Sequence, residues 1–127
     1  MSYQIITNNH NVKKHYDETT FVEGGFEEVL LKVRDLVHSG YELISHPLGA
    51  SLRMFFSPYR SIIVGDQVID VDEMHVQIIE NSIENYRKHM KERKPDIENK
   101  DDYALIDEVL LKASIEEHKK LKIFNNK

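Results

Sequence analysis

Residues 33–61 place the end of a helix, a short apolar run and a polar loop next to one another, and this succession constrains the fold most strongly. Upstream, apolar residues recur every three or four positions, which predicts a helix over 26–38 that Gly40 terminates. The run that follows at once, 41–45, is apolar and typical of a buried strand. A change from helical to strand periodicity within a few residues is characteristic of α/β proteins.

The same two patterns recur along the rest of the chain. Short apolar or β-branched runs bounded by turn-forming residues predict strands at 4–7, 19–22, 41–45 and 61–64. Helical periodicity predicts helices at 26–38, 72–92 and 102–120. Since the strands are apolar, the inner ones are expected to be covered on both faces. We therefore predict a single α/β domain over 1–127, in which helices pack on a small, mostly parallel four-stranded sheet and extra helices follow at the C-terminus.

Two local features of the last helices are also predicted. Asp70 and Glu73 have the spacing of a capping box at the start of helix 72–92. In the final helix, the apolar positions expected to face inward are Tyr103, Ile106, Val109 or Leu110, and Ala113, with Leu121 and Phe124 as further candidates.

Composition excludes several classes of partner. A formal net charge of −5 argues against nucleic acid, whose binding surfaces are basic. The chain has no Cys, which excludes disulfides and thiol chemistry. Its apolar runs are shorter than the ~18–20 residues of a membrane span, and the N-terminus lacks the basic start and cleavage site of a signal peptide. We expect a cytoplasmic protein that binds neither membranes nor nucleic acid.

A candidate ligand site follows from the strand ends. In open α/β sheets, ligands bind beyond the carboxyl ends of the strands. If the first three strands are parallel, the polar turns that follow them at Asn8, Asn9 and His46 converge at one edge of the sheet. The alternative is that the two Asn side chains simply form the hydrogen bonds of turns.

The end of helix 26–38 contributes further candidates. Its last turns carry Arg34, Asp35 and His38, and basic side chains at a helix C-terminus commonly just complement the helix dipole. The functional reading brings His38 to His46, with the Arg60 guanidinium binding an anion. The candidate ligand-binding residues are therefore Asn8, Asn9, Arg34, Asp35, His38, His46, Arg60 and Ser61.

Other patterns give no cofactor or metal site. Gly24 and Gly25 precede a helix, but the neighbouring glutamates would repel a phosphate, so backbone freedom at a turn explains the pair better. His10 and His15 do not have a standard metal-ligand spacing. The apolar segment 54–56 lies either under the sheet or in an exposed contact patch. Because the chain carries more apolar surface than one small core needs, we expect a homodimer that uses helix 72–92, the Phe55 loop or both.

Five segments carry a resemblance to a known family. They are Ile6-Thr7-Asn8-Asn9, Val22-Glu23-Gly24, Val29-Leu30 with the run from Val33 to Gly40, Ser45-His46-Pro47-Leu48 and Pro58-Tyr59-Arg60-Ser61-Ile62. In order and spacing they resemble the GrdX family, small proteins associated with the gene clusters for glycine, sarcosine and betaine reductase in amino-acid-fermenting anaerobes. The resemblance covers residues 5–64 and implies a role in that system without implying a reaction.

Two hypotheses on function remain open at this point. The first is an accessory or regulatory protein that binds a partner protein, such as a reductase-system protein, or a small anionic metabolite. The second is a small enzyme that uses His46 with Arg60 or Asp35 on a carboxylate- or phosphate-bearing substrate. A concave pocket that joins His46, Arg60 and Asn8 would favour the enzyme, and a flat apolar surface around Phe55 would favour the binding protein.

Overall fold

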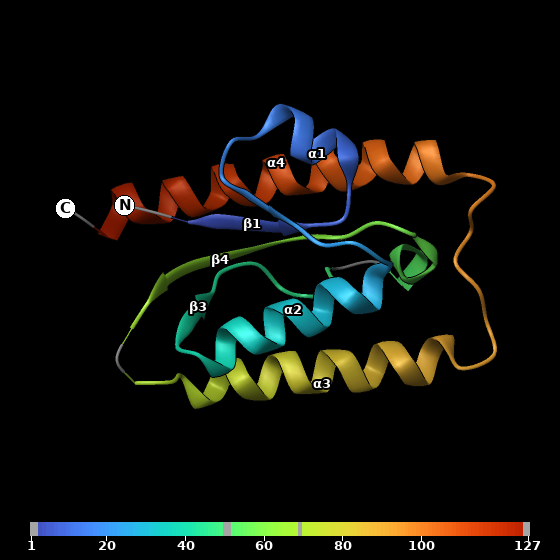
Figure 1. Ribbon diagram of the computed structural model, residues 1–127. Helices are drawn as coiled ribbons and strands as arrows, with labels where there is room; N and C mark the ends of the chain where they lie inside the picture. Colours follow the sequence, from blue (N-terminus) through green and yellow to red (C-terminus); the bar gives the residue numbers. More distant parts are fainter. Residues whose placement is uncertain (1–2, 50–51, 69, 126–127) are drawn as a thin grey trace.

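Four strands form one sheet in the order β2-β1-β4-β3 (Figure 1). The computed structural model describes residues 3–49, 52–68 and 70–125. The strands are β1 (Gln4–Thr7), β2 (Thr19–Phe21), β3 (Tyr41–Leu43) and β4 (Ser61–Gln67). The α/β class and the four strands are thus as predicted.

The direction of the strands differs from the prediction. Only β1 and β2 are parallel, joined through the short helix α1 (His10–His15), which the sequence analysis did not predict. β4 is antiparallel to both β1 and β3, so the prediction of a mostly parallel sheet is wrong. A parallel return to the neighbouring strand requires a long crossover, usually a helix. The described part of the link from β3 to β4 contains only the short 3-10 helix η1 (Leu52–Phe56), so β4 returns antiparallel.

The polar turns nevertheless meet at one edge. Because β4 runs against both of its neighbours, β1, β2 and β3 all end at the edge where β4 begins. Thr7 at the end of β1 pairs with Ser61 at the start of β4 and with Phe21 at the end of β2. The turns after β1, β2 and β3 therefore lie at the same edge of the sheet, as the candidate site requires.

The sheet is covered on both faces. Helices α2 (Phe26–His38) and α3 (Glu73–Met90) lie on one side of it, and α1 with α4 (Lys100–Asn125) on the other (Figure 1). Successive residues of a strand point to opposite faces, and so Ile5 packs in the core under α4 while Ile6 packs in the core under α2 and α3. No helix in the described ranges combines the length and the apolar character that crossing a membrane requires.

Helix α4 is rotated relative to the prediction. Its buried side chains are Ala104, Asp107, Leu111 and Ile115. The expected inward positions Ile106, Val109 and Leu110 are exposed, so that part of the prediction is wrong. The rotation places a carboxylate, Asp107, against the sheet edge, where it meets several hydrogen-bond donors.

The apolar segment 54–56 belongs to the core. It lies in η1, where Met54 and Phe55 are 6% exposed and Phe56 packs against the core from its rim. Of the two alternatives for this segment, the core position is therefore correct. Self-association through helix 72–92, the Phe55 loop or both stays a prediction. That helix forms as α3, but its cap is Asp72, which accepts from the backbone N–H groups of Met74 and His75, in place of the predicted Asp70.

Candidate functional site

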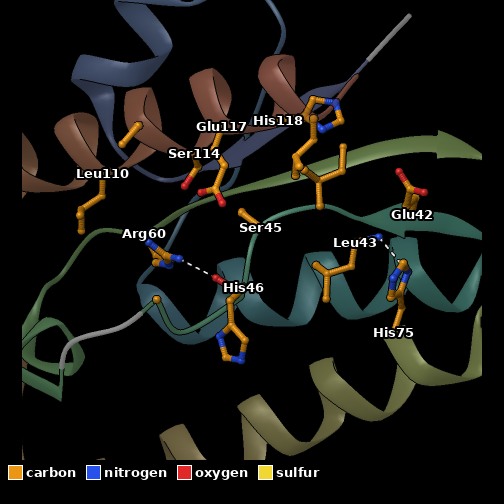
Figure 2. Close-up of a pocket in the computed structure, with 14 residues that line it drawn as sticks. Glu42, Leu43, Ser45, His46, Arg60, His75, Leu110, Ser114, Glu117 and His118 are labelled. Atoms are coloured by element: carbon orange, nitrogen blue, oxygen red, sulfur yellow. Dashed lines mark hydrogen bonds between the residues drawn. The ribbon is translucent and has the colours of Figure 1, made fainter. Parts of the chain in front are cut away.

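A groove of about 620 Å³ lies between α4 and the edge strand β3 (Figure 2). It forms because α4 packs on β1 and β4, through Leu111 and Ile115, and overhangs β3. Most of its lining comes from one side of α4 and from the segment 42–49. The lining residues are Glu42, Leu43, Ile44, Ser45, His46, Gly49, Arg60, His75, Leu110, Ala113, Ser114, Glu117, His118 and Leu121.

The Arg60 guanidinium is the fixed cation of this groove. Its side chain is 7% exposed, and two of its nitrogens donate to backbone carbonyls: Nε to Pro47 O at 2.7 Å and Nη2 to His46 O at 2.7 Å. The turn 46–49 therefore wraps the guanidinium. Gly49, at φ +71°, lies against it, and a Cβ there would approach Nη2 to 3.5 Å. Burial lowers the pKa of Arg60, while the charge of Asp107 opposes that shift.

The third guanidinium nitrogen of Arg60, Nη1, keeps N–H groups that have no hydrogen-bond partner among the described residues. Nη1 lies 4.0 Å from Asp107 Oδ1, which is too long for a hydrogen bond. Within the described residues it has no other polar partner. A guanidinium carries five N–H donors, and two of them are used by the carbonyls of the turn.

Asp107 joins α4 to the edge of the sheet, and the sequence analysis missed it. This fully buried carboxylate accepts hydrogen bonds from the Ser61 amide at 2.9 Å, the Ser61 hydroxyl at 2.7 Å and Asn9 Nδ2 at 3.0 Å. Burial raises the pKa of Asp107, while these hydrogen bonds and the charge of Arg60 oppose the rise. The sequence did carry a signal for the position of Asp107, because Ala104, Asp107 and Leu111 have the spacing of residues on one side of a helix.

Asn8 and Asn9 bind the backbone of the sheet edge. Asn8 donates to Gly24 O at 2.9 Å and to Pro58 O at 2.8 Å, and accepts from the Arg60 amide at 2.9 Å. Asn9 caps α1 through the Asn11 amide and donates to Ala104 O. Neither Asn lines the groove. Asn9 forms a local hydrogen bond with the Asn11 amide, as the alternative expected, whereas Asn8 bonds backbone groups that are distant along the chain.

His46 lines the groove mainly through its backbone. Its carbonyl holds Arg60, whereas its imidazole points away from the guanidinium (Figure 2). His46 Nδ1 accepts from the Leu48 amide at 3.1 Å. Burial and, to a smaller degree, the charge of Arg60 lower the pKa of His46 from its ordinary value.

The remaining candidates lie elsewhere. Arg34, Asp35 and His38 are on α2, on the other face of the sheet, and none lines the groove. Arg34 Nε lies 3.8 Å from Asp35, and His38 Nε2 lies 2.8 Å from Glu80 of α3. Ser61 is buried in the Asp107 network. Only Arg60 and His46 of the eight candidates therefore border the groove, and ligand binding by any of them stays a prediction.

Several lining residues were not predicted. Glu42 lies on β3, and Ser114, Glu117 and His118 share one side of α4. The ring nitrogen Nε2 of His118 is buried and has no hydrogen-bond partner in the described structure. The sequence shows that these three α4 residues share one side of a helix, but it does not show which strand lies opposite that side. Among the described residues, no three His, Asp or Glu side chains gather as metal ligands would.

Fold and groove together define a small α/β protein with a mixed sheet and a polar groove over one edge strand. The model of a family described as GrdX-like protein matches residues 4–116. The chain belongs to this GrdX-like family, as the five segments in its first half suggested, and the match extends through most of α4. No curated protein and no solved structure matches the chain.

Proposed function

We propose that the protein is an accessory or regulatory protein of the glycine, sarcosine and betaine reductase system that binds a small anionic metabolite in the groove. The link to the reductase system comes from the resemblance to the GrdX family. The single observation that carries the binding role is the Arg60 guanidinium, which is held rigidly at the groove and keeps unused donors.

The chemistry of Arg60 suits a carboxylate or a phosphate. A guanidinium forms paired, charge-assisted hydrogen bonds with such groups, and these are about twice as strong as neutral ones. The two carbonyls of the turn fix the plane of the guanidinium, so a ligand would not have to order it. The nearest carboxylate, Asp107, compensates the buried charge from 4.0 Å and leaves Nη1 without a hydrogen bond.

The other hypotheses have less support. A partner protein that docks on an apolar surface around Phe55 is disfavoured because Phe55 is buried. A small enzyme would need His46 to act together with Arg60 or Asp35. The His46 ring points away from Arg60, and Asp35 is outside the groove (Figure 2). The groove joins His46 and Arg60 without Asn8, so it lacks part of the arrangement expected for the enzyme.

Replacing Arg60 by Lys tests the binding role. Lys keeps the positive charge but cannot bond both carbonyls and a ligand in one plane. We expect Arg60→Lys to weaken binding of propionate or phosphate about tenfold or more, in line with the ~1.5–3 kcal/mol of a charge-assisted hydrogen bond. Isothermal titration calorimetry measures the affinity. Arg34→Lys, on α2, is the matched control and should leave it unchanged. Equal affinity of wild type and a folded Arg60→Lys variant would contradict the proposal.

Association with the reductase system has its own test. The immobilised protein is expected to retain reductase components from an extract of an amino-acid-fermenting anaerobe grown on glycine, sarcosine or betaine. Mass spectrometry identifies what is retained. If reductase components are retained no better than by an unrelated protein of similar charge, the association is wrong and metabolite binding alone stands.

A further inference from the structure

Two unpaired carboxylates share the groove with Arg60. Glu42 enters from β3 and Glu117 from α4. In the described part of the chain, neither has a hydrogen bond or an ion pair with another residue. Figure 2 shows Glu117 reaching from α4 toward Ser45, and Glu42 at the end of the groove remote from Arg60. The groove therefore has a cationic end and an acidic side.

A plain anion would pair with only part of this charge pattern. The described lining offers one guanidinium, whose charge Asp107 already compensates in part, and two unpaired carboxylates, together with the imidazoles of His46, His75 and His118. A ligand with only a carboxylate would pair with Arg60 and leave Glu117 and Glu42 without a cation. Recognition favours complementary charges and penalises like charges brought together. A ligand that carries a cationic group as well as a carboxylate can pair with Arg60 and with a carboxylate of the groove.

Part of the groove lining is apolar. Ile44, Leu110 and Leu121 contribute apolar lining. On β4, Gly65 makes room for the Ile44 and Glu42 side chains, because a Cβ there would lie 3.0 Å from Ile44 Cδ1 and 3.1 Å from Glu42 Oε1. A groove of about 620 Å³ is within the size range of small-molecule sites. It is larger than a ligand of only a few heavy atoms requires.

We infer that the groove binds an extended zwitterion, with a carboxylate at Arg60 and an ammonium group at one of the two carboxylates, Glu117 beside Ser45 or Glu42 at the remote end. An ω-amino acid has this chemistry. The inference rests on the proposed function for the binding of the ligand carboxylate at Arg60. It adds the role of Glu117 and Glu42, which select a ligand that also carries an ammonium group. Glu117 and Glu42 determine specificity, and Arg60 supplies the anchor.

Three probes of equal chain length separate the two ends. They are 6-aminohexanoate with both charges, hexanoate with the carboxylate alone, and hexylamine with the ammonium alone. Calorimetry should give at least tenfold tighter binding of 6-aminohexanoate than of hexanoate. Glu117→Gln combined with Glu42→Gln should remove that preference. Glu116→Gln, an exposed neighbour on α4 that does not line the groove, should leave it intact.

The outcomes distinguish this inference from the proposed function. If hexanoate binds as tightly as 6-aminohexanoate and Arg60→Lys weakens both, the zwitterion inference is overturned and anion binding stands. If hexylamine binds as tightly as 6-aminohexanoate and Arg60→Lys changes neither, both the inference and the anion-binding proposal are wrong. Absence of binding by all three probes to the folded protein would also overturn both. Circular dichroism verifies that each variant is folded.

Discussion

Asp107→Ala is expected to lower the free energy of unfolding by about 3–5 kcal/mol, the range seen when one partner of a buried ion pair is removed. Asp107 is fully buried and accepts three hydrogen bonds, two from Ser61 and one from Asn9. Its loss leaves those donors unsatisfied and removes the carboxylate nearest to the buried Arg60 guanidinium. Because the same contacts attach α4 to the sheet, the packing of α4 should loosen as well. Urea denaturation followed by circular dichroism measures the change.

The matched control is Glu116→Ala, which removes an exposed carboxylate from the same helix. Its effect should stay within about 0.5 kcal/mol, as for most surface substitutions. If Asp107→Ala is no more destabilising than Glu116→Ala, the network around Asp107 does not hold α4 in place. Faster amide exchange in α4 than in α2 of a folded Asp107→Ala variant would give independent support to the role in packing α4.

Phe55→Ala is also expected to cost about 3–5 kcal/mol of unfolding free energy, as is typical of deleting a buried aromatic side chain. Phe55 is 6% exposed in η1, and its ring centroid lies 4.8 Å from that of His89 and 6.0 Å from that of Tyr86. Both partners belong to α3, so the substitution opens a cavity between η1 and this helix. Chemical denaturation gives the size of the loss.

Val109→Ala on the exposed side of α4 is the control for Phe55→Ala, and it should change stability by less than about 0.5 kcal/mol. Light scattering on the same samples compares the particle mass with the 14.9 kDa of one chain. A Phe55→Ala variant of unchanged stability and reduced particle mass would show that Phe55 is a contact between copies, contrary to the structure described here.

Local patterns predicted the elements whose residues carry their own signal. The helix over 26–38 forms at those bounds, since its apolar stripe and the terminating Gly40 are features of neighbouring residues. Helix 72–92 forms as Glu73–Met90 for the same reason. Strands 4–7 and 61–64 are short apolar runs, and helices cover them on both faces of the sheet. The short helix after Asn9 was missed because six residues with one buried apolar side chain, Val12, show no clear periodicity.

No local sequence pattern indicates whether β4 runs parallel or antiparallel to its neighbours. Period-two alternation is the same in a parallel and an antiparallel strand, so residues 61–64 reveal a strand without its orientation. The rotation of α4 was equally hidden, because this helix has apolar residues on more than one side and the wrong side was chosen. The buried side combines Leu111 and Ile115 with the hydrogen bonds that join α4 to the sheet edge.

Local sequence patterns were thus enough to predict the α/β class, most of the elements and the family, and they pointed to Arg60 and His46. The packed chain alone shows that the turn 46–49 holds Arg60, that Asp107 lies beside it, and that Glu42 and Glu117 face the same groove. The physical reason is distance along the chain. Ser61 and Asp107 are 46 positions apart and meet only once β4 and α4 have packed, and a contact of that kind leaves no periodicity in the sequence.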